Sequence, residues 1–172
     1  SEMCIRDSIR QFLEEEENLL LRDNVKMHFT ASAWVLNPSK NKVLMLYHNI
    51  YQSWSWSGGH ADGEGDLLSV AMKEVKEESG LVSLKPLSDS PISIEILGVQ
   101  PHYKKQKYVS AHLHLNYTFL LHNTKEEKLK ICPEENSKVG WLSPDEAVRS
   151  STEAWMKPIY EKLNQKMKEY LG

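Results

Sequence analysis

The sequence predicts one domain of the α+β class, in which helices pack on a mixed β-sheet. Segments that alternate apolar and polar residues, as strands do, are interleaved with segments whose apolar residues recur at helical spacing. The clearest strand pattern covers 108–121 and the clearest helical pattern covers 67–79. The chain of 172 residues, 40% of them hydrophobic, is long enough to bury one core.

Composition excludes several classes of protein. The formal net charge of −3 gives no general electrostatic reason to bind nucleic acid or an anionic membrane, so neither is expected as a partner. No apolar run approaches membrane-spanning length, and the acidic N-terminal residues do not resemble a signal peptide. Two cysteines, Cys4 and Cys132, are too few for a disulfide framework and indicate a reducing, cytoplasmic location.

The chain begins with a predicted amphipathic helix from about Ile5 to Arg22, which forms an N-terminal extension over residues 1–25. The acidic run Glu14–Glu17 is interpreted as its solvated face. Partner binding, including a homodimer, is the weaker alternative for this helix. The core of the single domain is expected over 27–150, followed by a C-terminal helix within 153–171.

Two strands, 27–36 and 42–48, are predicted on either side of a turn rich in Asn, Pro and Ser. The next extended segment places Trp54 and Trp56 on the same face. Core packing is the favoured interpretation, because tryptophans are usually buried anchors. The alternative is a stacking wall for a substrate ring, which makes both residues candidates for substrate binding.

A glycine-rich acidic loop from Gly58 to Asp66 leads into the helix that begins at Leu67. Asp66 stands where an N-cap is expected, and Gly80 where a left-handed residue would end the helix. The apolar residues of the helix form a stripe that faces the core. These are Leu67, Leu68, Ala71, Met72 and Val75.

Three carboxylates, Glu74, Glu77 and Glu78, fall on one flank of this helix. Like charges at this spacing repel each other, and partial burial increases the repulsion. A fully solvated face would tolerate them, and so would a hard cation bound among the oxygens. Mg²⁺ and Mn²⁺ prefer such oxygen ligands and keep positions for water and phosphate.

The stretch from Gly59 to Leu81 resembles the Nudix box, Gly-x5-Glu-x7-Arg-Glu-U-x-Glu-Glu-x-Gly-U, where U is apolar. The spacing requires no gap, and two positions depart from the pattern: Gly65 replaces the first Glu and Lys73 replaces the Arg. A loop and helix matched together form a specific signal. The matching residues are Gly59, Glu74, Val75, Glu77, Glu78, Gly80 and Leu81.

The resemblance implies a Nudix-type α/β/α sandwich with a mixed central sheet, to which this chain adds its N-terminal and C-terminal helices. It also implies Mg²⁺, with Mn²⁺ as a substitute, held by Glu74, Glu77, Glu78 and the carbonyl of Gly59. Glu77 and Glu78 then belong to the catalytic centre. A further acidic residue outside the box often serves such a site, and Glu135 is the candidate, with Glu134 beside it.

The two departures weaken parts of the pattern. In the family the box arginine orients a helix glutamate, whereas Lys73 offers a point charge without the planar fork of a guanidinium. Gly65 removes a carboxylate that supports the metal site in the family. A retained but retuned metal site is expected, with loss of activity as the alternative.

Beyond the box, a strand is predicted at 92–99 and a loop at 101–108 that carries three lysines between two tyrosines. The favoured interpretation is that these lysines lie on the solvated surface. The alternative is that Lys105 contacts a substrate phosphate. His60, next to Gly59, is a further candidate for substrate contact.

The strand pattern at 108–121 has one apolar face and one polar face, and the polar face carries His112 and His114. Hydrogen-bonded structural histidines beside a wet cavity are the first interpretation, and substrate binding is the second. Such a pair can bind zinc, but no third and fourth ligand with familiar spacing accompanies it.

The chain is predicted to end with a short strand at 139–142, a capping box at Ser143, and the C-terminal helix. That helix should turn four residues inward. They are Ile159, Leu163, Met167 and Tyr170.

Taken with the resemblance, these features predict a Nudix-type pyrophosphohydrolase. It would split a nucleoside diphosphate linked to another moiety, X–P–P–Y, by attack of water on phosphorus. One alternative is a non-catalytic nucleotide sensor on the same scaffold. The other is an allylic diphosphate isomerase, which would need a pocket cysteine that neither Cys4 nor Cys132 convincingly supplies. The identity of the substrate cannot be read from these residues.

Overall fold

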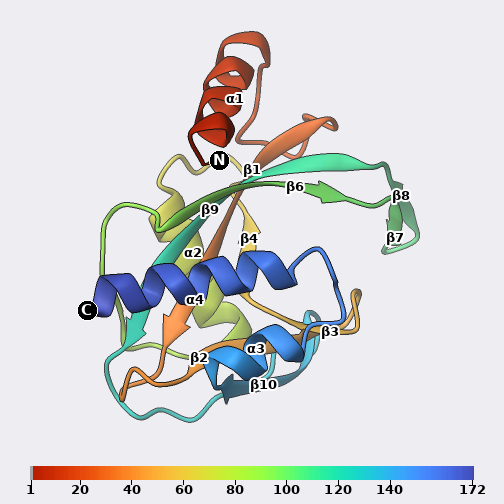
Figure 1. Cartoon of the computed structure of the whole chain (residues 1–172). Helices are drawn as coiled ribbons and strands as arrows, with labels where there is room; N and C mark the ends of the chain where they lie inside the picture. The colour runs from red at the N-terminus through yellow and green to blue at the C-terminus, as the bar shows by residue number, and fades with distance from the viewer. Residues whose placement is uncertain (1) are drawn as a thin grey trace.

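The computed structural model describes residues 2–172. It has the predicted α+β fold, a mixed sheet between two layers of helices (Figure 1). The helices are α1 (Glu2–Glu15), α2 (Leu67–Ser79), α3 (Pro144–Arg149) and α4 (Lys157–Leu171). The strands of the main sheet are β1 (Met27–Leu36), β2 (Val43–His48), β3 (Ser53–Ser55), β4 (Ser57–His60), β5 (Leu84–Pro86), β6 (Ser93–Val99), β9 (His112–Asn123) and β10 (Asn136–Leu142). A separate hairpin pairs β7 (His102–Lys104) with β8 (Lys107–Val109).

The centre of the sheet is the parallel pair β1 and β9, in register from Met27 opposite Leu113 to Leu36 opposite His122. The remaining pairs are antiparallel, so the sheet is mixed as predicted. The main path runs β10-β2-β1-β9-β5, while β4 also pairs with β1 and β6 with β9. Every residue of β1 is buried, because both faces of the sheet are covered at its centre.

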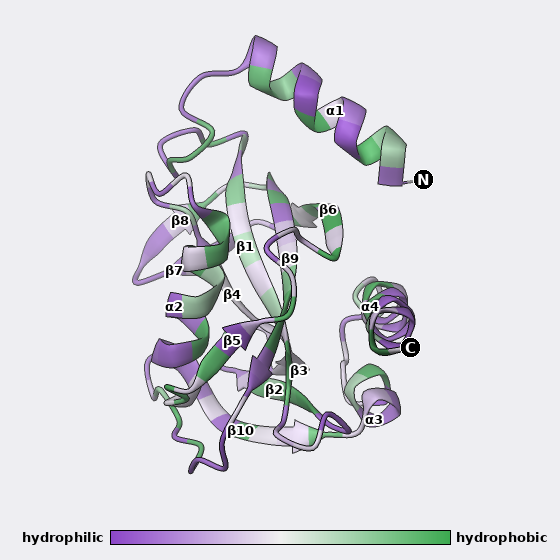
Figure 2. Ribbon diagram, turned by 90° about the vertical axis from the view of Figure 1, so that its left-hand side faces the viewer, coloured by the Kyte–Doolittle hydropathy of each residue, from purple (hydrophilic) through white to green (hydrophobic). Residues whose placement is uncertain are grey.

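The two faces carry different helices, as Figure 2 shows edge-on. On one face, the apolar stripe of α2 packs on the odd-numbered residues of β1, such as Ala31 and Ala33. On the other face, α4 packs on the even-numbered residues, with Tyr160 stacked on Trp34 at 5.4 Å between ring centroids. The alternation of a strand therefore assigns each β1 side chain to the α2 face or the α4 face.

The N-terminal helix is shorter than predicted. It ends at Glu15 rather than near Arg22, and residues 16–26 form turns. These turns bond to the sheet and to the glycine-rich loop: Phe29 N donates to Leu19 O at 2.7 Å and Gly63 N to Leu20 O at 2.8 Å. Tertiary hydrogen bonds thus replace the helix that the apolar spacing favoured.

Two expectations for the region after β6 were wrong. Residues 101–108 are not a plain loop but contain the hairpin β7–β8, which turns at Lys105 and Gln106 with positive φ. The long strand is β9, which begins at His112 instead of Tyr108 and continues to Asn123.

The polar face of β9 does not line the wet cavity that the sequence predicted, at least at its central residues. Asn116 and Thr118 are fully buried. Thr30 and Ser32 donate to Asn116 Oδ1 at 2.8 and 2.9 Å, and Thr118 donates to Glu95 at 2.9 Å. Neighbouring strands satisfy these groups, since a buried polar side chain without a partner would be costly.

The predicted caps are confirmed. Asp66 caps α2 by accepting from Ser69 N, Gly80 ends it with φ 76°, and Ser143 and Glu146 form the capping box of α3. The inward position of Tyr170 was wrong, because its side chain is half exposed and its hydroxyl donates to Leu87 O. None of the helices found in residues 2–172 has the length and apolarity to cross a membrane. The domain boundaries at 25–27 and 150–153 stay predictions.

The C-terminal helix should stabilise the fold through its inward face. We expect Leu163→Ala to lower the free energy of unfolding by about 2–5 kcal/mol, because Leu163 is fully buried and its truncation leaves a cavity. Urea unfolding measures this change. Leu171→Ala, on the same helix at 40% exposure, is the control and should cost much less. Equal costs for both variants would contradict the packing described here.

Candidate active site

Helix α2 orients the carboxylates of the box through the apolar residues buried beside them. Val70, Ala71 and Val75 pack into the core below β1, so the flank with Glu74 and Glu78 lies against β4. The two caps fix where this helix begins and ends. The helix therefore presents its acidic residues to the glycines that precede it in sequence.

Gly59 and Glu74 are in close contact. A Cβ atom built on Gly59 would lie 2.3 Å from Glu74 Cδ and 2.5 Å from Glu74 Oε1. Only glycine leaves space for the carboxyl group at this place, which explains the glycine that opens the box. The contact brings a carboxylate beside the main chain of β4.

Glu78 is buried at 6% exposure and is held on several sides. Its Oε1 accepts from Ser57 Oγ at 2.9 Å and from Gly58 N at 3.2 Å. Its main-chain oxygen accepts from Asn136 Nδ2 at 2.9 Å. These contacts fix the orientation of Glu78, as the supporting groups of metal-binding carboxylates do.

Burial and mutual repulsion make this set of carboxylates electrostatically unfavourable. Burial, followed by the charge of Glu77, raises the pKa of Glu74 to about 7, although Lys73 acts in the opposite direction. Burial also raises the pKa of Glu78 to about 8, with further increases from Glu74 and Glu135 and decreases from the bonds of Ser57 and Gly58. A divalent cation among these oxygens would relieve the repulsion, so the donor set fits Mg²⁺ or Mn²⁺.

Glu77 lies at the open side of this group. Its side chain is 55% exposed, and Lys73 Nζ approaches its Oε1 at 3.8 Å. Both side chains reach a surface hollow that Ser69, Met72 and Lys76 complete. Lys73 thus makes one loose, solvated contact, and it does not hold Glu77 as a guanidinium fork would.

Glu135 comes from a distant part of the chain. It directly precedes β10, and its main-chain oxygen accepts from Asn49 N at 3.0 Å. Its charge contributes to raising the pKa of both Glu74 and Glu78, so Glu135 acts on the box electrostatically. Glu134 is exposed beside Cys132, whose Sγ lies 3.8 Å from Glu134 Oε2.

The two tryptophans belong to the other face of the sheet. Trp54 and Trp56 both pack against the core cluster that α3 and α4 cover. Trp54 meets Tyr47 edge-on at 5.9 Å, and Trp56 meets Tyr160 at 5.6 Å. These contacts agree with core packing, the favoured interpretation of the sequence, and their contact with substrate stays untested.

Lys105 lies at the exposed turn of the β7–β8 hairpin. The charge of its neighbour Lys104 contributes to lowering the pKa of His48 and of His60, after burial. A phosphate contact by Lys105 remains a prediction.

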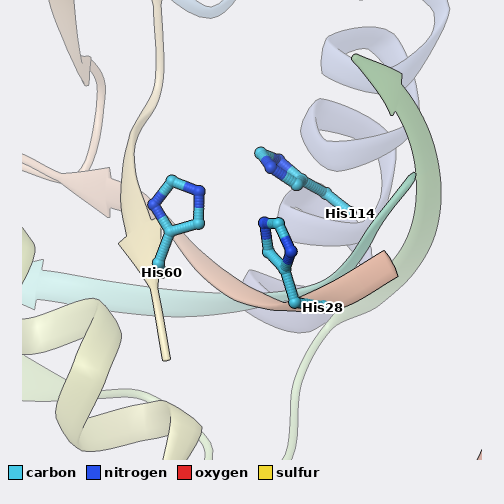
Figure 3. Close-up of side chains that lie close together, drawn as sticks. All are labelled: His28, His60 and His114. Carbon is cyan, nitrogen blue, oxygen red and sulfur yellow. The ribbon is translucent and has the colours of Figure 1, made fainter. Parts of the chain in front are cut away.

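The histidines gather on the opposite face of the sheet from the box glutamates. His60, His112 and His114 lie with His28, a residue that the sequence did not single out, and the ring centroids of neighbouring members are 4.9–5.1 Å apart (Figure 3). Burial is the main cause that lowers the pKa of His60 to about 3 and of His114 to about 2. Both rings are therefore neutral near pH 7, and their predicted contact with substrate stays untested.

The glycine-rich loop is fastened by a contact that sequence reasoning missed. Arg22 pairs with Asp62 through both oxygens, with Nε to Oδ1 at 2.8 Å and Nη2 to Oδ2 at 2.6 Å. Asp62 has a φ of 46°, a conformation that the loop imposes. No spacing in the sequence links residues 22 and 62, because the pairing follows from the tertiary position of the turns after α1.

The comparison with known proteins assigns the family. The profile of the NUDIX domain matches residues 26–163, which is most of the chain. The protein belongs to the NUDIX family, as the box predicted. This membership supports the predicted class of enzyme, a pyrophosphohydrolase. Among curated proteins, none matches the sequence.

Solved structures share the fold at low sequence identity. An Ap4A hydrolase of C. elegans in a binary complex is 18% identical, with a TM-score of 0.62 over 82% of this chain and 98% of that one. A NUDIX-family hydrolase from Clostridium perfringens is 17% identical, with a TM-score of 0.59 over 82% and 96%. The E. coli dihydroneopterin triphosphate pyrophosphohydrolase is 17% identical, with a TM-score of 0.57 over 78% and 92%.

The contact between Gly59 and Glu74 can be tested directly. We expect Gly59→Ala to remain folded but to bind Mn²⁺ at least about tenfold more weakly, because the new methyl group must displace the Glu74 carboxyl. Titration of the purified variant with Mn²⁺ measures this affinity. Gly65→Ala is the matched control, since nothing lies within 4 Å of a Cβ at Gly65. Equal affinities in the two variants would refute the role given to this contact.

Proposed function

We propose that the protein hydrolyses a diphosphate linkage in a nucleoside diphosphate derivative and that the reaction depends on Mg²⁺. The observation that carries the proposal is the gathering of Glu74 and Glu78 against Gly59 and Gly58, with Glu77 on the open side. Family membership supports the reaction class.

The residues fit a hard divalent ion. Glu74, Glu77 and Glu78 would hold it together with the carbonyl oxygen of Gly59, and Mn²⁺ would serve as a substitute. When bound, such an ion neutralises the diphosphate, lowers the pKa of a water molecule and stabilises charge on the leaving phosphate. Carboxylates alone would repel an anionic substrate, so the site needs this cation to work.

The chain supplies orientation and proton transfer. Ser57, Gly58 and Asn136 hold Glu78 in place through its side chain and its main chain. The charge of Glu135 contributes to raising the pKa of Glu74 and Glu78, and Glu135 is proposed as the base that takes a proton from the attacking water. Lys73 and Lys76 border the hollow beside Glu77 and can counter the charge of substrate phosphates.

The structural neighbours support the proposed substrate class. One is described as an Ap4A hydrolase and another as a dihydroneopterin triphosphate pyrophosphohydrolase. At 18% and 17% identity they share the fold with this chain. We therefore propose a nucleotide-type substrate, together with a cytoplasmic location and a homodimer.

A nucleotide sensor is the second candidate, favoured by two observations. Gly65 lacks the family carboxylate, and Lys73 approaches Glu77 at 3.8 Å without a bidentate contact. A sensor would bind nucleotides at the same surface and release no product. Activity measurements on the purified protein separate this function from hydrolysis.

The deciding experiment is a panel of nucleoside diphosphate derivatives incubated with Mg²⁺, with phosphate products detected by chromatography. We expect turnover of at least one compound and a decrease of at least about tenfold in Glu77→Gln, because the variant loses a proposed metal ligand. Glu161→Gln, an exposed change on α4, is the control and should keep full turnover. Binding without product would favour the sensor, and unchanged turnover in Glu77→Gln would refute the metal ligands.

The first departure from the family pattern is also testable. We expect Gly65→Glu to fold normally, since the space around Gly65 is open, and to bind Mg²⁺ more tightly because the family carboxylate is restored. Thermal unfolding at increasing Mg²⁺ concentration measures the affinity. Gly65→Gln has nearly the same shape without the charge and should leave the affinity unchanged. A gain in both variants would assign the effect to the loop backbone instead of the carboxylate.

A further inference from the structure

The four clustered histidines occupy the sheet face opposite to the box glutamates. Residues paired across antiparallel strands share a face, and neighbours within a strand alternate. Gly59 pairs with Ala31, which packs under α2, whereas His60 pairs with Thr30 on the other face. His28 lies directly opposite His114 in the parallel pair, so these two side chains also share that second face.

The rings converge on one space. In Figure 3, His28, His60 and His114 extend from three strands and point toward one another. One ring nitrogen from each lies within 4.8 Å of the others. His112 adds a fourth imidazole, since its Nε2 is 3.1 Å from Nε2 of His114.

In two of the rings, the Nδ1 atom is hydrogen-bonded to a main-chain carbonyl oxygen. His28 Nδ1 lies 3.1 Å from Asn24 O, and His112 Nδ1 lies 2.8 Å from Ser110 O. Each Nδ1 must donate to its carbonyl, which leaves the Nε2 of that ring as the atom that can offer a lone pair. In His28 this atom has no hydrogen-bond partner within residues 2–172, whereas in His112 it is hydrogen-bonded to Nε2 of His114 at 3.1 Å, a contact that a bound metal ion would replace. A backbone carbonyl bonded to the second ring nitrogen is the usual support of a metal-binding histidine.

The lone pair of His28 has no partner among the described residues. Its side chain is 5% exposed, and Nε2 is buried without a hydrogen bond. Buried polar atoms are nearly always satisfied, so this one calls for a bound group. A ring nitrogen of His28 lies within 4.8 Å of ring nitrogens of His60 and His114, so a group that accepts lone pairs from several rings at once would fit this place.

We infer that His28, His60 and His114, with His112 as a fourth donor, form a binding site for a transition-metal ion of the Zn²⁺ type. Imidazole nitrogens suit Zn²⁺, whereas Mg²⁺ prefers oxygen. A tetrahedral zinc site with Zn–N bonds of about 2.0–2.1 Å separates its ligand atoms by roughly 3.3 Å. The His112–His114 pair already has nearly this separation, and small side-chain rotations would bring the other rings inward.

The charges around the cluster permit such an ion. Arg22 and Lys104 act on His60, and both carry positive charge. Asp62 also acts on His60 and pairs with Arg22 through both oxygens, which offsets much of that charge. A metal ion at this site would link β1, β4 and β9. Because His60 follows Gly59 at the end of β4, the ion would also hold in place the strand against which Glu74 packs.

The test uses the full chain, purified without a histidine tag, stripped with EDTA and equilibrated with ZnCl₂. We expect about one strongly held zinc per chain by elemental analysis and a higher unfolding temperature with zinc. In His28→Gln and His112→Gln the zinc affinity should fall at least about tenfold. His122→Gln, at the other end of β9 beside Pro38 O, is the matched control and should bind as the parent does.

Two further measurements distinguish zinc binding at this site from metal binding at the proposed Mg²⁺ site. Glu77→Gln should keep the zinc, and cobalt substituted for zinc should give the visible absorption of a tetrahedral nitrogen site. Both results are expected even if the protein hydrolyses none of the nucleoside diphosphate derivatives. The inference is overturned if the parent retains no zinc, if the two histidine variants bind it as tightly as the parent, or if Glu77→Gln alone loses it.

Discussion

The pairing of β4 with β1 is the constraint on which both polar clusters depend. The register that sets Gly59 opposite Ala31 directs residue 59 toward α2 and residue 60 toward the other face. A shift by one residue would exchange these faces, because side chains alternate with a period of two. The burial of all ten residues of β1 on both sides makes such a shift costly and fixes the register.

The same register explains why the box begins with glycine. The carboxyl group of Glu74 occupies the place where a side chain at residue 59 would lie. Helix α2 can hold this carboxylate against β4 because its apolar stripe is buried under β1. Burial then raises the pKa of Glu74 and Glu78, so the packing that forms the helix also creates a site that favours a divalent cation.

The two faces of the sheet carry donors of different chemistry. The α2 face gathers carboxylate oxygens, which suit hard ions that activate water, while the opposite face gathers neutral imidazoles, which suit zinc-like ions. His60 and Gly59 are adjacent in the chain, so the two clusters are joined through the backbone of β4. This arrangement separates a proposed catalytic ion from a proposed structural one without a second domain.

The sequence by itself determined those features of the protein that depend on local patterns of residues. Helix α2 and its caps, the alternation that predicts β1, and the spaced glutamates of the box depend on residues close in the chain, so the α+β class and the NUDIX family could be read directly. Only the tertiary structure decided where α1 ends, that Arg22 fastens the loop at Asp62, and that the charge of Glu135 acts on the box. It also brought His28 to His114, residues separated by most of the domain but directly opposite in the parallel pair of strands. Strand register across such a distance is set by burial of whole faces, and no spacing in the sequence records it.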